Sequence, residues 1–319
     1  MGLPKIPILN FQISPGILYA LIACVLFGSN APIAKVLLQE ISPQLLTALL
    51  NTGAAFGLSV LIMGRYLQQN FFPPTDTSLI QQSPPRTPDN FLQGRDWFWF
   101  AITTLLGGVT APTLFIYGVS QIPASIASLL LSFEGMATAV IAWILFKEKF
   151  HWLVAVAIAL ILAGTVILNS GVNTSERNFG GTLAVVTAGF CWATDNNLTR
   201  KIAHRDPLPI ALGKNIAAGI INGSIALSLG TSLPPLGWML LACTLGIFSY
   251  GLSFTFLIMA LRLLGASRAG AYFSITPFVG TGLSIIFLRD PITPNFLVAA
   301  ILIALGVSLC IYEQLRNPS

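Results

Sequence analysis

Charged residues are scarce in this sequence. Asp, Glu, Lys and Arg make up 8% of its 319 residues, while 55% are hydrophobic. Soluble domains carry about 25% charged residues. A water-soluble fold of this length could not shield so much apolar surface, so a soluble globular protein is excluded and a lipid bilayer is the expected solvent. The mean hydropathy of +0.80 leads to the same conclusion.

Histidine and cysteine are also rare, and neither is clustered. The chain has two His and four Cys, and no two Cys form a CxxC pair, so neither a zinc site nor a disulfide framework is predicted. No GxxxxGKS or GxxxxGKT motif for nucleotide binding occurs. The net charge of +5 comes from scattered basic residues, so no nucleic-acid partner is expected. We predict no cofactor.

Long apolar runs separated by turn-forming residues are what the sequence has instead. A membrane-spanning helix needs about 20 mostly apolar residues. Ten segments meet this requirement, so we predict an all-α integral membrane protein with ten transmembrane helices. The first run is long enough to span a membrane and no cleavage site follows it, so we expect it to remain as a helix. The predicted spans are 16–38, 43–64, 97–119, 124–146, 151–170, 180–200, 208–229, 236–261, 266–288 and 294–313.

Basic residues predict how the chain is oriented in the membrane. With a cytoplasmic N-terminus, 12 of the 16 Lys and Arg residues fall on the inner side and 3 on the outer side. The remaining one, Lys214, lies in the seventh span, and we expect its ammonium group to reach the inner surface. We therefore place both termini in the cytoplasm, with the chain in a cell membrane of the bacterial inner-membrane type. The polar segment 65–95, rich in Pro, Gln, Ser and Thr, is predicted to be a flexible cytoplasmic loop.

The two halves of the sequence resemble each other. When residue 124 is aligned with residue 266, Ala-Ser falls on Ala-Ser; we call this the 124/266 alignment. When Asn30 is aligned with Asp195, Phe27 falls on Trp192; we call this the 30/195 alignment. These matches keep the order of the helices, which indicates an internal repeat.

The repeating unit is five helices long. We assign the first unit to residues 1–172, with the cytoplasmic loop 65–95, and the second to residues 173–319. Because five is odd, the second unit enters the membrane from the opposite side. Two inverted five-helix repeats are the architecture of many secondary transporters, whose substrate site lies near the midplane between the halves.

The segments that carry this repeat resemble the ten-helix EamA-type carriers of the drug/metabolite transporter superfamily. In that family each repeat opens with an aromatic residue followed by Gly or Ala, and its fourth helix ends near an acidic residue. The resemblance covers nearly the whole chain outside 65–95. It implies a carrier, often an exporter of amino acids, amines or other metabolites, driven by an ion or exchange gradient. We expect a small-molecule substrate, a proton or another ion as the coupling ion, and a monomer or homodimer. The resembling segments are 26–35, 124–148, 191–200 and 266–290.

Glu134 is the strongest candidate for a mechanistic residue. It lies near the middle of the span that begins at residue 124. A carboxylate at this depth costs several kcal/mol unless it is paired, hydrated or protonated. It could bind a substrate ammonium group or hold a coupling proton. The alternative is a protonated carboxyl group that is hydrogen-bonded to a neighbouring backbone or hydroxyl group.

Four further polar residues lie where lipid would reject them. Asn30 closely precedes Pro32, and an interrupted helix of this kind points to a transporter site, although a plain kink has the same signature. Asp195 and Asn196 lie toward the inner end of the sixth span, either as a gate, a cavity wall or a break in the helix, or as an interfacial polar end with local ion pairing. Asn51 lies in the second span, where many EamA-type carriers have an arginine.

Three aromatic residues complete the list of candidate site residues. Trp192, Tyr117 and Tyr250 could line a cavity and stack on a cationic or apolar substrate. The alternatives are interfacial anchoring and packing. By contrast, Ser125 and Ser128 belong to a face of small residues on the fourth span, which is predicted to pack against another helix.

A membrane-embedded enzyme acting on a lipid-soluble substrate is the alternative function. Such an enzyme needs several His or acidic residues clustered at the membrane interface, and the two His residues here lie in separate joints. No Lys or Arg is placed at the midplane, which favours a cationic, zwitterionic or neutral substrate over a phosphorylated one. The preferred function is therefore a carrier of small molecules and not an enzyme.

The charge distribution makes the topology testable. In a variant without its native cysteines, single cysteines placed within 76–89 should react with a membrane-impermeant thiol reagent only from the cytoplasm. Cysteines placed within 173–176 should react only from outside, because the basic residues cluster on the opposite side. Reversed labelling of either segment would contradict the predicted orientation or number of spans.

Overall fold

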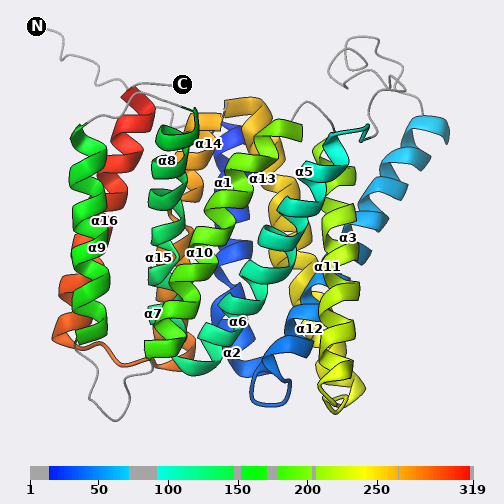
Figure 1. Cartoon of the computed structure of the whole chain (residues 1–319), viewed down its shortest axis with the longest axis horizontal. Coiled ribbons are helices and arrows are strands. Elements are labelled where there is room, and N and C mark those ends of the chain that lie inside the picture. The colour runs from blue at the N-terminus through cyan, green and yellow to red at the C-terminus, as the bar shows by residue number, and fades with distance from the viewer. Residues whose placement is uncertain are drawn as a thin grey trace, which may run out of the picture.

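The computed structural model describes residues 14–71, 92–146, 152–170, 179–202, 206–264 and 266–316. Within these ranges all regular elements are helices, and they join into ten rods that stand side by side (Figure 1). Seven of the rods are long and apolar enough to cross a membrane. The predicted all-α membrane fold is therefore confirmed.

The ten rods follow the ten predicted spans. The largest difference is the second rod, which continues to Phe71 and so includes the first part of the predicted loop. Residues 72–91, and the second tested segment at 173–176, lie outside the described residues. The rods are α1 (Pro15–Gly28) with α2 (Asn30–Leu37); α3 (Pro43–Phe71); α5 (Asp96–Thr103) with η2 (Thr104–Thr110) and α6 (Ala111–Gln121); α7 (Ala124–Leu130) with α8 (Ser132–Phe146); α9 (Trp152–Ser170); α10 (Phe179–Thr199), followed by the short turn η3 (Arg200–Ile202); α11 (Pro207–Ser228); α12 (Leu236–Gly246) with η4 (Ile247–Leu252) and α13 (Ser253–Leu264); α14 (Ala266–Phe273) with α15 (Thr276–Leu283) and η5 (Ser284–Leu288); and α16 (Pro294–Arg316).

Proline and a capping carboxylate fix the ends of several rods. Pro207 is the first residue of α11, where a missing N–H costs nothing, and Asp206 Oδ1 accepts a hydrogen bond from the Leu208 N–H at 3.1 Å. At the end of α6, Ile122 has an extended backbone with φ −128° and ψ 162°. A residue before proline avoids the helical region, so Pro123 ends the rod.

Five of the rods are interrupted near their middle. The first rod turns at Ser29, as the sequence predicted, because Pro32 cannot donate a backbone hydrogen bond. The fourth rod breaks at Leu131 and the ninth at 274–275, which are nearly equivalent positions in the 124/266 alignment. The third and eighth rods contain the wide π-helical turns η2 and η4, which are often found at functional sites. These four interruptions were not predicted.

Contacts between α9 and α16 show how the two halves are related. A Cβ at Gly164 of α9 would lie 2.7 Å from Cγ1 of Ile303 on α16. A Cβ at Gly306 of α16 would lie 2.7 Å from Cγ1 of Ile161 on α9. The 124/266 alignment matches Gly164 with Gly306 and Ile161 with Ile303, so it converts each of these contacts into the other. Such an exchange is what a twofold axis between the two helices produces.

The direction of this axis shows that the repeats are inverted. The equivalent helices α9 and α16 pack against each other, and so do α3 and α11. In Figure 1 these pairs lie at the left and the right of the molecule, with α1 and α10 between them. The axis therefore runs across the rods, in the plane of the membrane, and the two five-helix repeats are inverted. The boundary at residue 172 falls outside the described residues and stays a prediction.

Close helix packing makes one glycine of α3 sensitive to substitution. A Cβ at Gly53 would collide with the backbone carbonyl of Cys243 on α12, whereas a Cβ at Gly64 on the same helix would meet no described atom within 4 Å. We expect Gly53→Ala to lower the free energy of unfolding by about 1–3 kcal/mol, the usual cost of overpacking.

Gly64→Ala is the matched control for this prediction. It should leave the melting temperature unchanged or slightly higher, since Ala favours helix over Gly by about 1 kcal/mol. Thermal unfolding of the purified variants in detergent checks both. Equal melting temperatures for the two variants would show that the α3–α12 contact is not as close as described.

Candidate functional site

An aromatic cluster lies on the pseudo-twofold axis. Phe27 of α1 and Trp192 of α10 are equivalent in the 30/195 alignment, and their rings meet edge to face with centroids 6.3 Å apart. Two equivalent residues can touch only beside the axis, so this contact marks the centre of the molecule. Phe27 also contacts Tyr250 at 6.0 Å and Phe273 at 5.7 Å, and Trp192 contacts Phe115 at 5.6 Å.

Two buried polar atoms without a partner among the described residues lie around this cluster. Asn30 is 1% exposed, and its Nδ2 donates a hydrogen bond to Ser249 Oγ at 2.9 Å. The unpartnered atoms are its Oδ1 and the hydroxyl oxygen of Tyr250. An unpaired buried polar atom is costly, so such atoms call for a bound water or ligand. Asn30 supplies a free acceptor and Tyr250 a free hydroxyl group.

The surroundings of Asp195 are equivalent to those of Asn30. The two alignments match Asn30 with Asp195 and Ser249 with Gly107. A Cβ at Gly107 would collide with the Asp195 carboxylate, so only glycine permits this close approach. The Gly107 carbonyl also accepts a hydrogen bond from Trp192 Nε1 at 3.1 Å. Gly107 in the wide turn η2 is therefore the neighbour of Asp195, and Ser249 in the wide turn η4 is the neighbour of Asn30.

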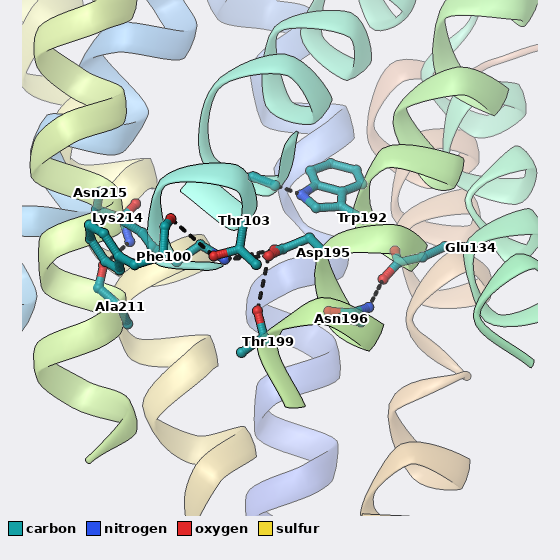
Figure 2. Close-up of polar contacts among 11 residues, drawn as sticks. Phe100, Thr103, Glu134, Trp192, Asp195, Asn196, Thr199, Ala211, Lys214 and Asn215 are labelled. Atoms are coloured by element: carbon teal, nitrogen blue, oxygen red, sulfur yellow. Dashed lines mark hydrogen bonds and ion pairs between the residues drawn. The ribbon is translucent and has the colours of Figure 1, made fainter. Parts of the chain in front are cut away.

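Asp195 forms a buried ion pair with Lys214 of α11. Lys214 Nζ lies 2.6 Å from Oδ1 and 2.8 Å from Oδ2, with side-chain exposures of 15% for Lys214 and 10% for Asp195. Thr199 Oγ1 donates a further hydrogen bond to Asp195 Oδ1 at 3.0 Å (Figure 2). The expectation that Lys214 extends to the inner surface is therefore wrong, because Asp195 neutralises its charge inside the bundle. The interpretation of Asp195 as part of a local ion pair agrees with this contact.

Asp195 and the two residues that follow it on α10 face different helices. Successive helical residues differ by about 100° in direction. Asp195 reaches α11, whereas the Nδ2 of Asn196 donates to Glu134 Oε1 of α8 at 2.9 Å. Asn197 Nδ2 donates to the Thr138 carbonyl of α8 at 3.1 Å. In Figure 2, Asp195 and Asn196 point to opposite sides of α10.

Glu134 lies in the first turn of α8, directly after the break in the fourth rod. Its backbone N–H donates to the Leu131 carbonyl at 2.9 Å, and its carboxyl group accepts the hydrogen bond from Asn196. The helix N-terminus favours a negative charge at this position. Among the described residues, Glu134 forms no ion pair with a Lys or Arg. It meets the opening helix of the second repeat, while Asn30 has Ser249 as its partner.

The remaining sequence candidates lie apart from these contacts. Asn51 is buried, and its Nδ2 donates to the Thr47 carbonyl of its own helix. Tyr117 on α6 is 44% exposed. Phe273 was not among the candidates, and Phe27 was noted only as the equivalent of Trp192. The equivalence of Phe27 and Trp192 could have identified Phe27 as a site residue. Trp192 was already a candidate for the central cavity, and its equivalent in the other repeat is expected near the same axis.

Ten spans in two inverted repeats, with interrupted helices around a buried polar centre, define the class of multi-pass membrane transporters. The model of the EamA-like transporter family matches residues 14–170 and 179–312, which is most of the chain. The chain belongs to this family, and the two matched segments correspond to its tandem repeats.

Several individual proteins are similar to this chain. An "Uncharacterized transporter" of Methanothermobacter thermautotrophicus is 28% identical over 302 residues, which cover 92% of this chain and 84% of that protein. A "Probable amino-acid metabolite efflux pump" of Salmonella typhimurium is 25% identical over 63% of this chain and 59% of that protein. A solved structure described as "Crystal structure of protein" has a TM-score of 0.62 at 19% identity, and the match covers 95% of this chain and 98% of that one. This last likeness concerns the fold alone.

The ion pair between Asp195 and Lys214 predicts a characteristic pattern of stability. Removing one partner leaves the other charge buried and uncompensated, which costs about 3–5 kcal/mol. Asp195→Asn and Lys214→Met should therefore each lower the melting temperature strongly. The double variant should recover most of the loss, because no unpaired charge remains. Thermal unfolding of all four proteins provides a double-mutant cycle, and additive losses would contradict a direct pair.

Proposed function

We propose that the protein is a secondary carrier that exports a small metabolite, such as an amino acid, an amine or a related compound, by alternating access. The observation that carries the proposal is the contact between Glu134 and Asn196. It joins an ionisable group at the break of a first-repeat helix to the opening helix of the second repeat. A change in the charge of Glu134 therefore acts where the two halves meet. The similarity to the Salmonella efflux pump supports the direction of transport.

Glu134 has the properties of a group that binds a cation reversibly. A carboxylate within the membrane must be neutralised by a partner, by a proton or by a bound cation. Its hydrogen-bond partner, the Asn196 amide, is neutral, in contrast to the Lys214 partner of Asp195. A substrate ammonium group or a coupling proton can therefore supply the missing positive charge.

The aromatic cluster and its unpaired polar atoms are the proposed substrate-binding surface. Trp192 and Tyr250 of the second repeat supply aromatic rings beside the axis, where both contact Phe27 of the first repeat. Asn30 Oδ1 can accept a hydrogen bond, and the Tyr250 hydroxyl can donate or accept one. A small molecule with both kinds of polar group would satisfy these atoms. Roles for Asn51 and Tyr117 stay predictions from the sequence.

Coupling follows from the cost of moving an unneutralised charge. While Glu134 is charged and unoccupied, rearranging the halves around it is unfavourable, because the carboxylate would pass through an apolar environment. Binding of a proton or an ammonium group removes this penalty and so favours the exchange of states. We place the carrier in the cell membrane with both termini in the cytoplasm. It moves its substrate without converting it chemically.

Glu134→Gln tests this role directly. The variant keeps the size and hydrogen bonding of the side chain but removes the charge. We expect transport of labelled amino acids and amines into reconstituted vesicles to fall by about tenfold or more, equivalent to roughly 1.4 kcal/mol. Any remaining transport should no longer depend on pH. The melting temperature should stay near that of the parent, since a neutral amide is no costlier there than a protonated acid.

Glu40→Gln provides a matched control, because Glu40 is exposed at the end of the first rod. It should transport like the parent. Full transport by Glu134→Gln with an unchanged pH dependence would refute the proposed role. Loss of transport in both variants would show that the effect is not specific to Glu134.

A further inference from the structure

The crossing of α7 and α15 is tightly packed. Gly280 of α15 lies against Ser128 of α7, where an added Cβ would be 2.7 Å from Ser128 Oγ and 2.8 Å from the Gly28 carbonyl oxygen. Thr281 Oγ1 donates a hydrogen bond to the Ser125 carbonyl at 3.1 Å. The predicted packing role of Ser125 and Ser128 agrees with these contacts. The two repeats are thus joined closely at this end of the molecule.

The equivalent crossing at the other end is not packed in this way. The 124/266 alignment matches α7 with α14, the first part of α8 with α15, and Ser128 with Gly270. A Cβ at Gly270 would meet no described atom within 4 Å. In the parts of the chain that the structure describes, α8 and α14 lack the extensive contact seen between α7 and α15. The two crossings are equivalent in the repeat but differ in the structure.

Lys35 of α2 holds the joint between α6 and α7. Its Nζ donates hydrogen bonds to the carbonyl oxygens of Val119 at 2.7 Å, Ser120 at 3.2 Å and Ile122 at 2.9 Å. The last carbonyls of a helix have no partner within the helix and carry partial negative charge. One ammonium group therefore satisfies three carbonyls at the end of α6, and it ties α2 to this joint.

Asp290 holds the same joint from the second repeat. Its Oδ2 accepts a hydrogen bond from the Ser125 N–H at 2.8 Å, at the N-terminus of α7. Arg289 has a left-handed backbone with φ 56° at the end of η5, and this turn directly precedes Asp290. The Asp290 carboxylate also interacts electrostatically with the Lys35 ammonium group. The joint between α6 and α7 is thus bound by one repeat through Lys35 and by the other through Asp290.

We propose that Lys35 and Asp290 latch the joint between α6 and α7 and so keep the two repeats closed against each other at this end of the molecule. The inference rests on the proposed carrier function, in which the two crossings close in turn. When the latch is released, α7 separates from α15 and the crossing of α8 and α14 closes. Lys35 and Asp290 are positioning residues, which act through the helix ends that they hold. The latched end lies opposite the start of α1 and the end of α16 (Figure 1), and it is the outer end in the predicted orientation.

Two cysteine reporters test the latch without requiring transport. In a variant whose four native cysteines are replaced by alanine, Ser128→Cys reports the crossing of α7 and α15, and Gly270→Cys reports that of α8 and α14. The protein is placed in lipid nanodiscs, where a water-soluble maleimide reaches both ends. In the parent, we expect slow labelling at position 128 and fast labelling at position 270.

The latch variants should reverse this pattern. Lys35→Met and Asp290→Ala should raise the labelling rate at position 128 by roughly tenfold, since hydrogen bonds to charged groups are the strong ones, and should lower the rate at position 270. Asp290→Asn keeps an acceptor oxygen for the Ser125 N–H and should label at a rate near that of the parent. Glu40→Ala removes an exposed carboxylate at the same end and should have no effect.

The outcomes separate the latch from a merely structural role. Unchanged labelling at position 128 in Lys35→Met and Asp290→Ala would overturn the proposal. A rise at both positions would also overturn it, because that result indicates general loosening and not an exchange of states. If the parent shows no transport but the labelling reverses as expected, the latch stands and the proposed carrier function fails.

Discussion

The membrane interior offers no hydrogen bonds, and the whole structure depends on this constraint. Polar groups within the spans must find partners in the protein. Thr47, Thr52 and Ser59 bond to carbonyls one turn back in their own helix. Lys214 and Asp195 neutralise each other across two helices. Because most polar groups in the described part of the centre are satisfied in this way, the few that are not indicate where a ligand or proton can bind.

Two of these exceptions, together with the ionisable Glu134, lie in the interrupted helices. Asn30 follows the turn in the first rod, and Tyr250 lies in the wide turn η4. Glu134 begins the half-helix after the break in the fourth rod and has a neutral amide as its partner. An uninterrupted helix satisfies its own backbone, whereas an interrupted one directs side chains and free helix ends toward the interior. The same interruptions therefore create the polar centre and make the helices deformable.

The repeats are related by an axis, but the structure does not obey that symmetry fully. α9 and α16 exchange their contacts in the 124/266 alignment, while the crossings at the two ends of the molecule differ. Charge is asymmetric as well. Glu134 is matched by Thr276, and Lys214 is matched by Ala48 when Pro43 is aligned with Pro209. Two nearly equivalent halves allow two states of similar free energy, and the unmatched charges give a ligand or proton a way to favour one of them.

The sequence by itself determined the spans, their number and the repeat. The bilayer imposes the same length and apolar composition on every segment, so each span could be recognised without its neighbours. Only the tertiary structure decided the partners of the polar residues. Whether Lys214 meets Asp195 or water depends on how α10 and α11 are rotated about their axes, and Asp290 reaches Ser125 from the far end of the chain. Hydropathy does not encode such rotations, because they are fixed by side-chain packing between helices.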